Sequence, residues 1–186
     1  MPTIDKKHFI KTVTILYDTR EQKNAHILEA LSGMGIATEQ RKLDYGDYSF
    51  MADGRDFSLC CVVERKANVD ELYTNIMSDR ERLEKEFYAA AQLAKSFTLL
   101  IEGIGSWDEL KGYVVPDWAM QRNPCRKVKD IGTHVHSTLR AWTAGSRYHA
   151  SVEFVKDNKQ TAARLLELFY YYWRSYKEMT GARRNE

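Results

Sequence analysis

The run 57–66 (FSLCCVVERK) passes from a continuous apolar stretch into three charged residues. It follows the dipeptide Asp-Gly at 53–54, a strong signal for a hairpin turn, and is typical of a central strand. Side chains alternate across a strand, so Glu64 and Lys66 are expected on one face and Arg65 on the other. Such an apolar strand must lie in a β-sheet that is covered by other secondary-structure elements.

The hydrophobic pattern predicts further strands and helices around this one. Strands are expected at 12–17, 37–43, 48–52, 97–101 and 152–155. Helices are expected at 25–34, from residue 69 along an apolar stripe that reaches residue 94, at about 132–144, and from 158 to about 179. Residues 103–131 are expected to be irregular, with short helices around 107–110 and 116–120. This order predicts an α/β fold, a central mixed β-sheet flanked by α-helices, in one domain spanning 1–186.

Composition and charge exclude several classes of protein. No apolar run approaches the length that spans a bilayer, and residues 1–10 lack the apolar stretch of a secretory signal. We therefore expect no membrane partner and a cytoplasmic location, at the nucleoid or in a phage-infected cell. The net charge is only +2. Residues 120–150, however, contain several basic residues and a single acid, Asp130. This excess of positive charge favours either contacts with phosphates or an ordinary solvated surface.

A second acidic residue is expected beside Glu64. Asp47 lies at a glycine bend that opens the strand 48–52, and pairing of that strand with 57–66 brings Asp47 to the same end of the sheet. Two carboxylates beside a backbone carbonyl suit Mg²⁺, which lowers the pKa of a water molecule that then attacks a phosphate. Lys66 would orient that water or stabilise negative charge in the transition state. The alternative is an ion-pair cluster at the end of a strand.

The pattern Gly46-Asp47, Glu64-Arg65-Lys66 and Asp70 resembles the signature of the XPF-type structure-specific endonucleases, members of the PD-(D/E)XK restriction-endonuclease-like superfamily. The segment 18–21 (DTRE) is similar to an Asp-x-Arg-Glu element of that family. The segment 99–103 (LLIEG) is similar to the strand that follows its arginine-bearing helix, and looser likeness extends over most of the chain. The resemblance implies a restriction-endonuclease-like core that hydrolyses DNA with Mg²⁺ or Mn²⁺.

The resemblance also implies a role for each residue of the motif. The implied metal ligands are Asp18, Asp47, Glu64 and the backbone carbonyl of Arg65. The implied catalytic set is Asp18, Glu21, Asp47, Glu64, Arg65, Lys66, Asp70 and Arg80. Asp18 would otherwise cap the end of a strand, and Asp70 would otherwise complement a helix dipole. The side chain of Arg65 is expected to pair with Asp70 or Glu21.

The segment 79–83 (DRERL) is similar to the family's arginine-bearing helix, and its two arginines compete for one role. We favour Arg80 over Arg82. Where members of the family often have glutamine a few residues later, this chain has Glu84 and Glu86. The tandem helix-hairpin-helix module that often accompanies the family is not expected, because no residues remain to build it. A separate DNA-binding partner would then supply that function.

The closing helix contains 165–173 (LLELFYYYW), which is apolar nearly all round, whereas a helix packed on one sheet needs a single apolar face. Because the resembled family commonly dimerises, we predict a homodimer through this C-terminal helix. The alternative is a core helix whose tyrosine hydroxyls reach solvent. Trp107, Trp118 and Trp142 either stack on unpaired bases or belong to the core or an interface.

Together these expectations describe a metal-dependent DNA endonuclease of DNA repair or recombination. The resemblance implies branched, flap or single-strand/double-strand junction DNA as its substrate. One alternative is a catalytically silent DNA-binding scaffold of the same fold, although such relatives usually lose ligands and this chain keeps the acids and the lysine of the motif. Another is a restriction-like or resolvase-like nuclease that prefers other DNA.

Overall fold

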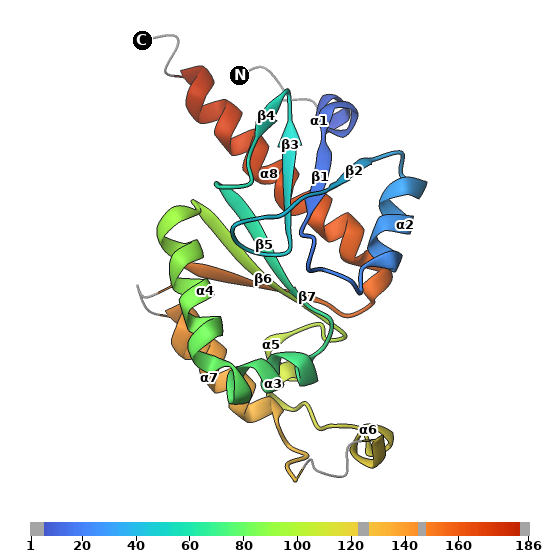
Figure 1. Cartoon of the computed structure of the whole chain (residues 1–186), viewed down its shortest axis with the longest axis vertical. Coiled ribbons are helices and arrows are strands. Elements are labelled where there is room, and N and C mark those ends of the chain that lie inside the picture. Colours follow the sequence, from blue (N-terminus) through green and yellow to red (C-terminus); the bar gives the residue numbers. More distant parts are fainter. Residues whose placement is uncertain (1–5, 123–126, 145–147, 183–186) are drawn as a thin grey trace.

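One mixed β-sheet forms the centre of the molecule in the computed structural model, which describes residues 6–122, 127–144 and 148–182 (Figure 1). Its strands are β1 (Thr14–Tyr17), β2 (Ala37–Gln40), β3 (Tyr48–Ala52), β4 (Arg55–Asp56), β5 (Cys61–Lys66), β6 (Ser96–Glu102) and β7 (Ala150–Val155). The strand order is β2-β1-β3-β5-β6-β7, and β4 pairs with β3. Strand β5 runs antiparallel to β3 and parallel to β6. The predicted central mixed sheet is therefore confirmed.

Helices cover both faces of the sheet (Figure 1). They are α1 (Lys6–Thr12), α2 (Ala25–Gly33), α3 (Val69–Ser78), α4 (Arg80–Leu93), α5 (Trp107–Lys111), α6 (Asp117–Arg122), α7 (Gly132–Ala144) and α8 (Thr161–Ala182), the last preceded by a 3₁₀ turn at Asn158–Gln160. Helices α1, α2 and α8 share one hydrophobic core with β1, β3 and β5. Helices α3, α4, α5 and α7 share the other with β6. Each face of the sheet thus has its own apolar core.

Strand β5 contributes to both cores by simple alternation. Cys61 and Val63 belong to the core under α8, whereas Val62 belongs to the core under α3 and α4. The alternation that the sequence predicted for its charged end is therefore confirmed. The strand begins later than expected, however, because the backbone N–H groups of Cys60 and Cys61 donate to the carbonyl of Phe57, which closes a turn there.

The long helix expected from residue 69 to residue 94 is two helices. Asp79 has φ −129° and ψ 28°, outside the helical region, and separates α3 from α4. Its N–H donates to the carbonyl of Asn75 and its carbonyl accepts from the N–H of Leu83, so it ends one helix and begins the next. The helix α1 was not expected from the sequence; it buries Phe9 against the core under α8.

Helix α8 buries most of the apolar side chains that suggested a second interface. Leu165, Phe169 and Trp173 are fully or almost fully buried within the chain, while Tyr171 and Met179 are exposed. Packing inside one chain therefore accounts for most of the apolar surface, and the homodimer remains a prediction. None of the helices in the described part of the chain is both long enough and apolar enough to cross a membrane.

Candidate active site

The bend at Gly46-Asp47 is built by backbone geometry. Gly46 has φ +66°, and a Cβ on it would lie 3.0 Å from the carbonyl oxygen of Val63 in β5. Only glycine combines that left-handed conformation with so close an approach. The N–H of Asp47 donates to the same Val63 carbonyl at 2.8 Å, and its carbonyl accepts from the N–H of Asp18 at 2.8 Å. Asp47 is thereby fixed between β1 and β5.

The carboxylate of Asp47 lies beside the charged end of β5. Its Oδ2 accepts a hydrogen bond from the backbone N–H of Arg65 at 2.7 Å. Burial raises the pKa of Asp47 well above its usual value, and the negative charge of Glu64 raises it further. Two carboxylates therefore meet at this end of the sheet, as the sequence predicted.

Lys66 is the cation nearest to this pair of acids. Its Nζ lies 2.7 Å from Oε1 of Glu64, and the two side chains are only 9% and 13% exposed. Burial disfavours the charge on Lys66, but attraction to Glu64, their hydrogen bond and the charge of Asp47 leave its pKa raised. The lysine is therefore protonated at neutral pH.

These three side chains open into a small pocket of about 190 Å³. Its lining consists of Arg20, Asp44, Tyr45, Gly46, Asp47, Glu64, Lys66, Arg82 and Glu86. A neighbouring hollow of about 280 Å³ shares Arg20, Asp47 and Lys66 and adds Glu21 and Arg65. Acidic and basic side chains from β5, α4 and the loops after β1 and β2 thus converge on one concave surface.

Arg65 points away from this pocket toward α2 and α8, where it is clamped by Glu102. Its Nε and Nη2 donate to the two carboxylate oxygens of Glu102 at 3.0 and 2.9 Å. It also contacts Glu21 at 3.3 Å and the carbonyl of Lys23 at 3.2 Å. The predicted contact with Glu21 is present. Arg65 also pairs with Glu102, which the sequence reasoning missed.

Glu102 is the centre of a buried polar network. Its Oε1 accepts from the hydroxyl of Thr161 at 2.6 Å and lies 3.1 Å from Nε2 of His26. Burial acts to raise the pKa of Glu102, but hydrogen bonds from Arg65, Thr161 and His26 leave it lowered. The network joins β5, β6, α2 and the start of α8. In the sequence, Glu102 was marked only as a lone acid at the end of an apolar strand. The structure shows that this strand, β6, runs parallel to β5.

Asp18 is not brought into the pocket. Its Oδ1 accepts from the backbone N–H and the Nε of Arg20, at 2.8 and 2.6 Å, and its Oδ2 accepts from the N–H of Leu43 at 2.6 Å. The carboxylate is fully buried. These contacts correspond to the alternative interpretation, a cap at the end of a strand. Asp18 instead positions Arg20, which does line the pocket and which the sequence reasoning did not single out.

The packing of α3 and α4 decides two expectations that concern these helices. Of the two partners expected for Arg65, Glu21 is the one it contacts, and Asp70 accepts a hydrogen bond from the hydroxyl of Tyr113 at 2.5 Å. Arg80 pairs with Glu84 at 2.8 Å and lies outside the described lining of the pocket, whereas Arg82 lines the pocket with Asp47 and Glu64. Because α4 begins anew after Asp79, the apolar pattern that starts in α3 does not determine which side of α4 faces the pocket.

The donor set of the pocket suits a hard cation. Among the described residues, no three His, Cys, Asp or Glu side chains are close enough together to hold a metal ion. Asp47 and Glu64 supply two carboxylates, and burial of Asp47, followed by the negative charge of Glu64, raises the pKa of Asp47. Oxygen donors of this kind fit Mg²⁺ or Mn²⁺, with water completing the coordination. Binding requires Glu64 to share its carboxylate with Lys66 and the ion.

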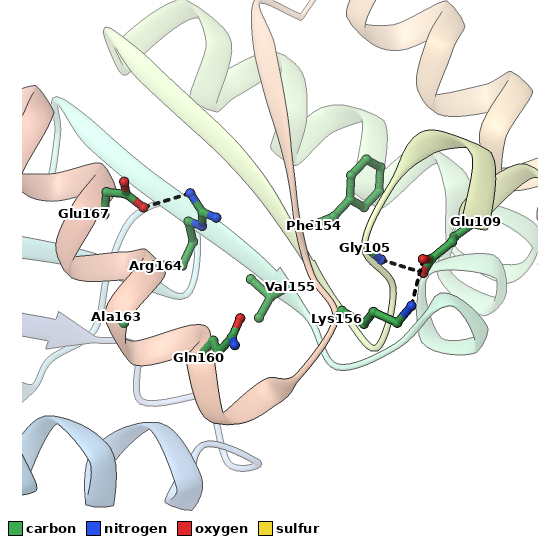
Figure 2. A pocket seen from close by; sticks show the side chains of 9 residues that line it. All are labelled: Gly105, Glu109, Phe154, Val155, Lys156, Gln160, Ala163, Arg164 and Glu167. Carbon is green, nitrogen blue, oxygen red and sulfur yellow. Dashed lines mark hydrogen bonds and ion pairs between the residues drawn. The ribbon is translucent and has the colours of Figure 1, made fainter.

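A larger hollow of about 490 Å³ lies elsewhere, beside the start of α8 (Figure 2). Figure 2 shows that its charged side chains pair with one another: Lys156 lies 2.8 Å from Glu109, and Arg164 lies 2.8 Å from Glu167. The described lining of this hollow contains no residue of the predicted site. Size alone therefore does not identify the reactive surface, and the smaller pocket at β5 is the candidate.

The chain is similar to a known protein family and to solved structures. A family profile described as the ERCC4 domain matches residues 17–168, well over half of the chain. A search of curated proteins finds no match. The structure of XPF from Aeropyrum pernix is similar with a TM-score of 0.60 and 18% identity, covering 90% of this chain and 69% of that chain.

A second structure, XPF from Aeropyrum pernix in complex with DNA, has a TM-score of 0.58 and 18% identity. The match covers 87% of this chain and 66% of that chain. At such identity the likeness concerns the fold, and it confirms the predicted restriction-endonuclease-like α/β architecture. The chain spans about two thirds of the length of these structures.

Proposed function

The chain belongs to the ERCC4 domain family of XPF-type nucleases, and on that premise we propose that it is a divalent-metal-dependent DNA endonuclease. The observation that carries the proposal is the meeting of Asp47, Glu64 and Lys66 in one pocket at the end of β5. Two acids and a buried, protonated lysine are the groups that hydrolysis of a phosphodiester requires. They also coincide with the motif by which the family was recognised.

We propose that Asp47, Glu64 and the backbone carbonyl of Arg65 hold Mg²⁺ or Mn²⁺. When bound, the cation offsets the charge of the two carboxylates and polarises a phosphate oxygen. The N–H of Arg65 holds the buried carboxylate of Asp47 in position for this role. The close approach of Gly46 to Val63 fixes the backbone bend that carries Asp47.

Lys66 keeps its proton at Nζ because its pKa is raised, so it carries a positive charge inside the pocket. We assign it the stabilisation of negative charge that develops on the phosphate during hydrolysis. Arg82 and Arg20, at the rim, are assigned to the flanking phosphates of the strand. Glu21, Arg65 and Glu102 support the site from behind rather than contacting the substrate.

For the substrate we propose branched, flap or single-strand/double-strand junction DNA, and for the biological role repair or recombination. Family membership and the likeness to a structure described as a complex with DNA support this choice. We further propose that residues 1–186 act as a single nuclease domain, that a separate partner supplies additional DNA binding, and that two chains associate through α8. Sedimentation at micromolar concentration tests the last point, and a monomer would contradict it.

The test is cleavage of labelled duplex, single strand, splayed arm, flap and four-way junction with Mg²⁺, Mn²⁺ or EDTA. Wild type is compared with Asp47→Asn and Glu64→Gln, and with Glu109→Gln as a control that loses an exposed ion pair far from the pocket. We expect metal-dependent cleavage that both site variants abolish and the control retains. Cleavage that survives either site substitution would refute the assignment of the pocket.

Two outcomes favour the alternatives. If the wild-type protein binds these DNAs and cuts none of them with either metal, the chain is a DNA-binding scaffold of this fold. If plain duplex is cut as well as the branched forms, the chain is a restriction-like or resolvase-like nuclease. The presence of both acids and the lysine in one pocket favours the endonuclease over the scaffold.

A further inference from the structure

Helix α6 stands apart from the sheet, beyond α3 and α5 (Figure 1). We call the described residues 113–122 and 127–130 the α6 arm. None of the side chains of α6 itself is buried. Ala119 and Met120 are half-buried against the core that contains α3 and α7, whereas the opposite surface of α6, with Trp118 and Arg122, is exposed. Packing therefore explains one side of the helix, and the exposed aromatic residue on the other side suggests a further use for that surface.

The base of the α6 arm is closed and is tied to the body. Val114 and Asp130 form an antiparallel bridge, and the N–H of Val115 donates to the carbonyl of Lys129 at 2.9 Å, which joins the two ends of the arm. The N–H of Gly132 in α7 donates to the carbonyl of Tyr113 at 3.0 Å, which ties the arm to the body. Lys129 also pairs with Asp117 at 2.6 Å, across the arm. At the base, a Cβ on Gly132 would lie 2.3 Å from the carbonyl oxygen of Leu110, so only glycine allows α7 to begin there. The arm therefore projects from a fixed base.

That base adjoins the element that leads out of the candidate site. The hydroxyl of Tyr113 donates to Asp70 in α3 at 2.5 Å. Helix α3 begins at Val69, directly after the strand that ends at Lys66. A DNA strand that leaves the pocket along α3 therefore passes toward the α6 arm.

The exposed surface of the arm pairs an aromatic ring with positive charge. Trp118 is 62% exposed, although tryptophan is the residue with the largest apolar surface to bury. The guanidinium of Arg122 lies 5.3 Å from the centre of its ring. Lys127 is exposed as well, and the acid Asp117 is already paired with Lys129. An exposed indole with one cation at its ring and a second exposed cation on the same arm is complementary to a base with its phosphates.

We propose that the α6 arm binds an unpaired stretch of the DNA substrate. Trp118 stacks on a base, and Arg122 and Lys127 contact the adjacent phosphates. The internal bases of a duplex are stacked on both faces, whereas the bases of a flap or splayed arm are free along the strand, so the arm distinguishes the two forms. This inference rests on the proposed function, because it assigns the unpaired part of the same substrate to a particular surface.

Binding is measured in EDTA, so that cleavage does not interfere, with the full chain and either single-stranded oligothymidylate or blunt duplex. We expect Trp118→Ala to weaken binding of the single strand by about tenfold. Binding of blunt duplex should change by less than about twofold, since its phosphate contacts remain. Tyr88→Ala, which removes an exposed aromatic ring from α4, is the matched control and should leave both affinities unchanged.

Fluorescence provides a second readout. Trp142 and Trp173 are buried, Trp107 is half-buried and Trp118 is exposed. Stacking on oligothymidylate should therefore quench a component that Trp118→Phe removes while affinity is largely kept. Lys127→Ala should weaken binding of the single strand and reduce the salt dependence of that binding by about one counterion. Unchanged affinity of Trp118→Ala for the single strand, or an equal loss for both DNA forms, would overturn the inference. If the wild type binds no DNA at all, the proposed function fails with it.

Discussion

Arg65 and Glu102 form a two-point contact, 3.0 and 2.9 Å long, on the face of the sheet opposite to the candidate active site. The side chain of Arg65 is thus held from behind, while its backbone N–H holds the carboxylate of Asp47 in front. Arg65 therefore links the buried network around Glu102 to the pocket that contains Asp47. Glu102 does not line the pocket and is a positioning residue for it.

Replacing Glu102 by glutamine should destabilise the protein strongly. The substitution leaves the buried guanidinium of Arg65 without its main counter-charge, which costs about 3–5 kcal/mol in comparable sites. Chemical denaturation measures the free energy of unfolding. Glu109→Gln, which breaks an exposed pair with Lys156, is the control and should unfold like the wild type. Equal stability of the two variants would contradict the role of the clamp.

Gly46→Ala should impair both folding and cleavage. Alanine at φ +66° costs about 1–2 kcal/mol, and its Cβ would press on the carbonyl of Val63 at 3.0 Å, so Asp47 must shift. Gly54 has φ +69° with no atom within 4 Å of its virtual Cβ, which makes Gly54→Ala the matched control. We expect the control to lose stability but retain cleavage per folded molecule. Full activity of folded Gly46→Ala would show that the bend tolerates a side chain.

Arg82→Ala should lower kcat/KM for DNA cleavage more than Arg80→Ala. Arg82 lines the pocket, and loss of one charged contact to a phosphate is worth about tenfold. Arg80 pairs with Glu84 on the same helix and does not line the pocket, so its removal should change cleavage little. Steady-state cleavage of a flap substrate by the two variants decides the matter. A larger defect in Arg80→Ala would restore the assignment that the sequence favoured.

Asp47→Asn should stabilise the metal-free protein at neutral pH. Burial and Glu64 raise the pKa of Asp47 above the value of roughly 3.9 expected in the unfolded chain. The native state then binds more protons between the two pKa values, so this group lowers stability as the pH rises through that window. Thermal unfolding in EDTA should show a higher Tm for the variant at pH 8 and a smaller difference at acid pH.

The same pair of proteins tests for the metal without relying on cleavage. Added Mg²⁺ should raise the Tm of the wild type, because a cation offsets the charge that burial of Asp47 makes unfavourable. It should raise the Tm of Asp47→Asn much less. Equal shifts in both proteins would place the cation elsewhere.

Features that depend on neighbouring residues were predictable from the sequence. The alternation of Glu64, Arg65 and Lys66 follows from the geometry of a strand, and the glycine bend places Asp47 at the end of the next one. The paired carboxylates and the lysine were therefore expected before the structure was known. The mixed sheet likewise follows from the order and period of the apolar segments.

Features that depend on contacts between distant segments were decided by the tertiary structure. Whether Arg80 or Arg82 reaches the pocket depends on how α4 restarts after Asp79, which packing against the sheet determines. Asp18 accepts a hydrogen bond from the N–H of Leu43, a residue far along the chain, because the oxygens of a buried carboxylate need hydrogen-bond donors. The partner of Arg65 was decided in the same way, since only the parallel pairing of β5 with β6 brings Glu102 within reach. Local periodicity specifies which face a side chain takes, whereas the register between elements specifies what it meets there.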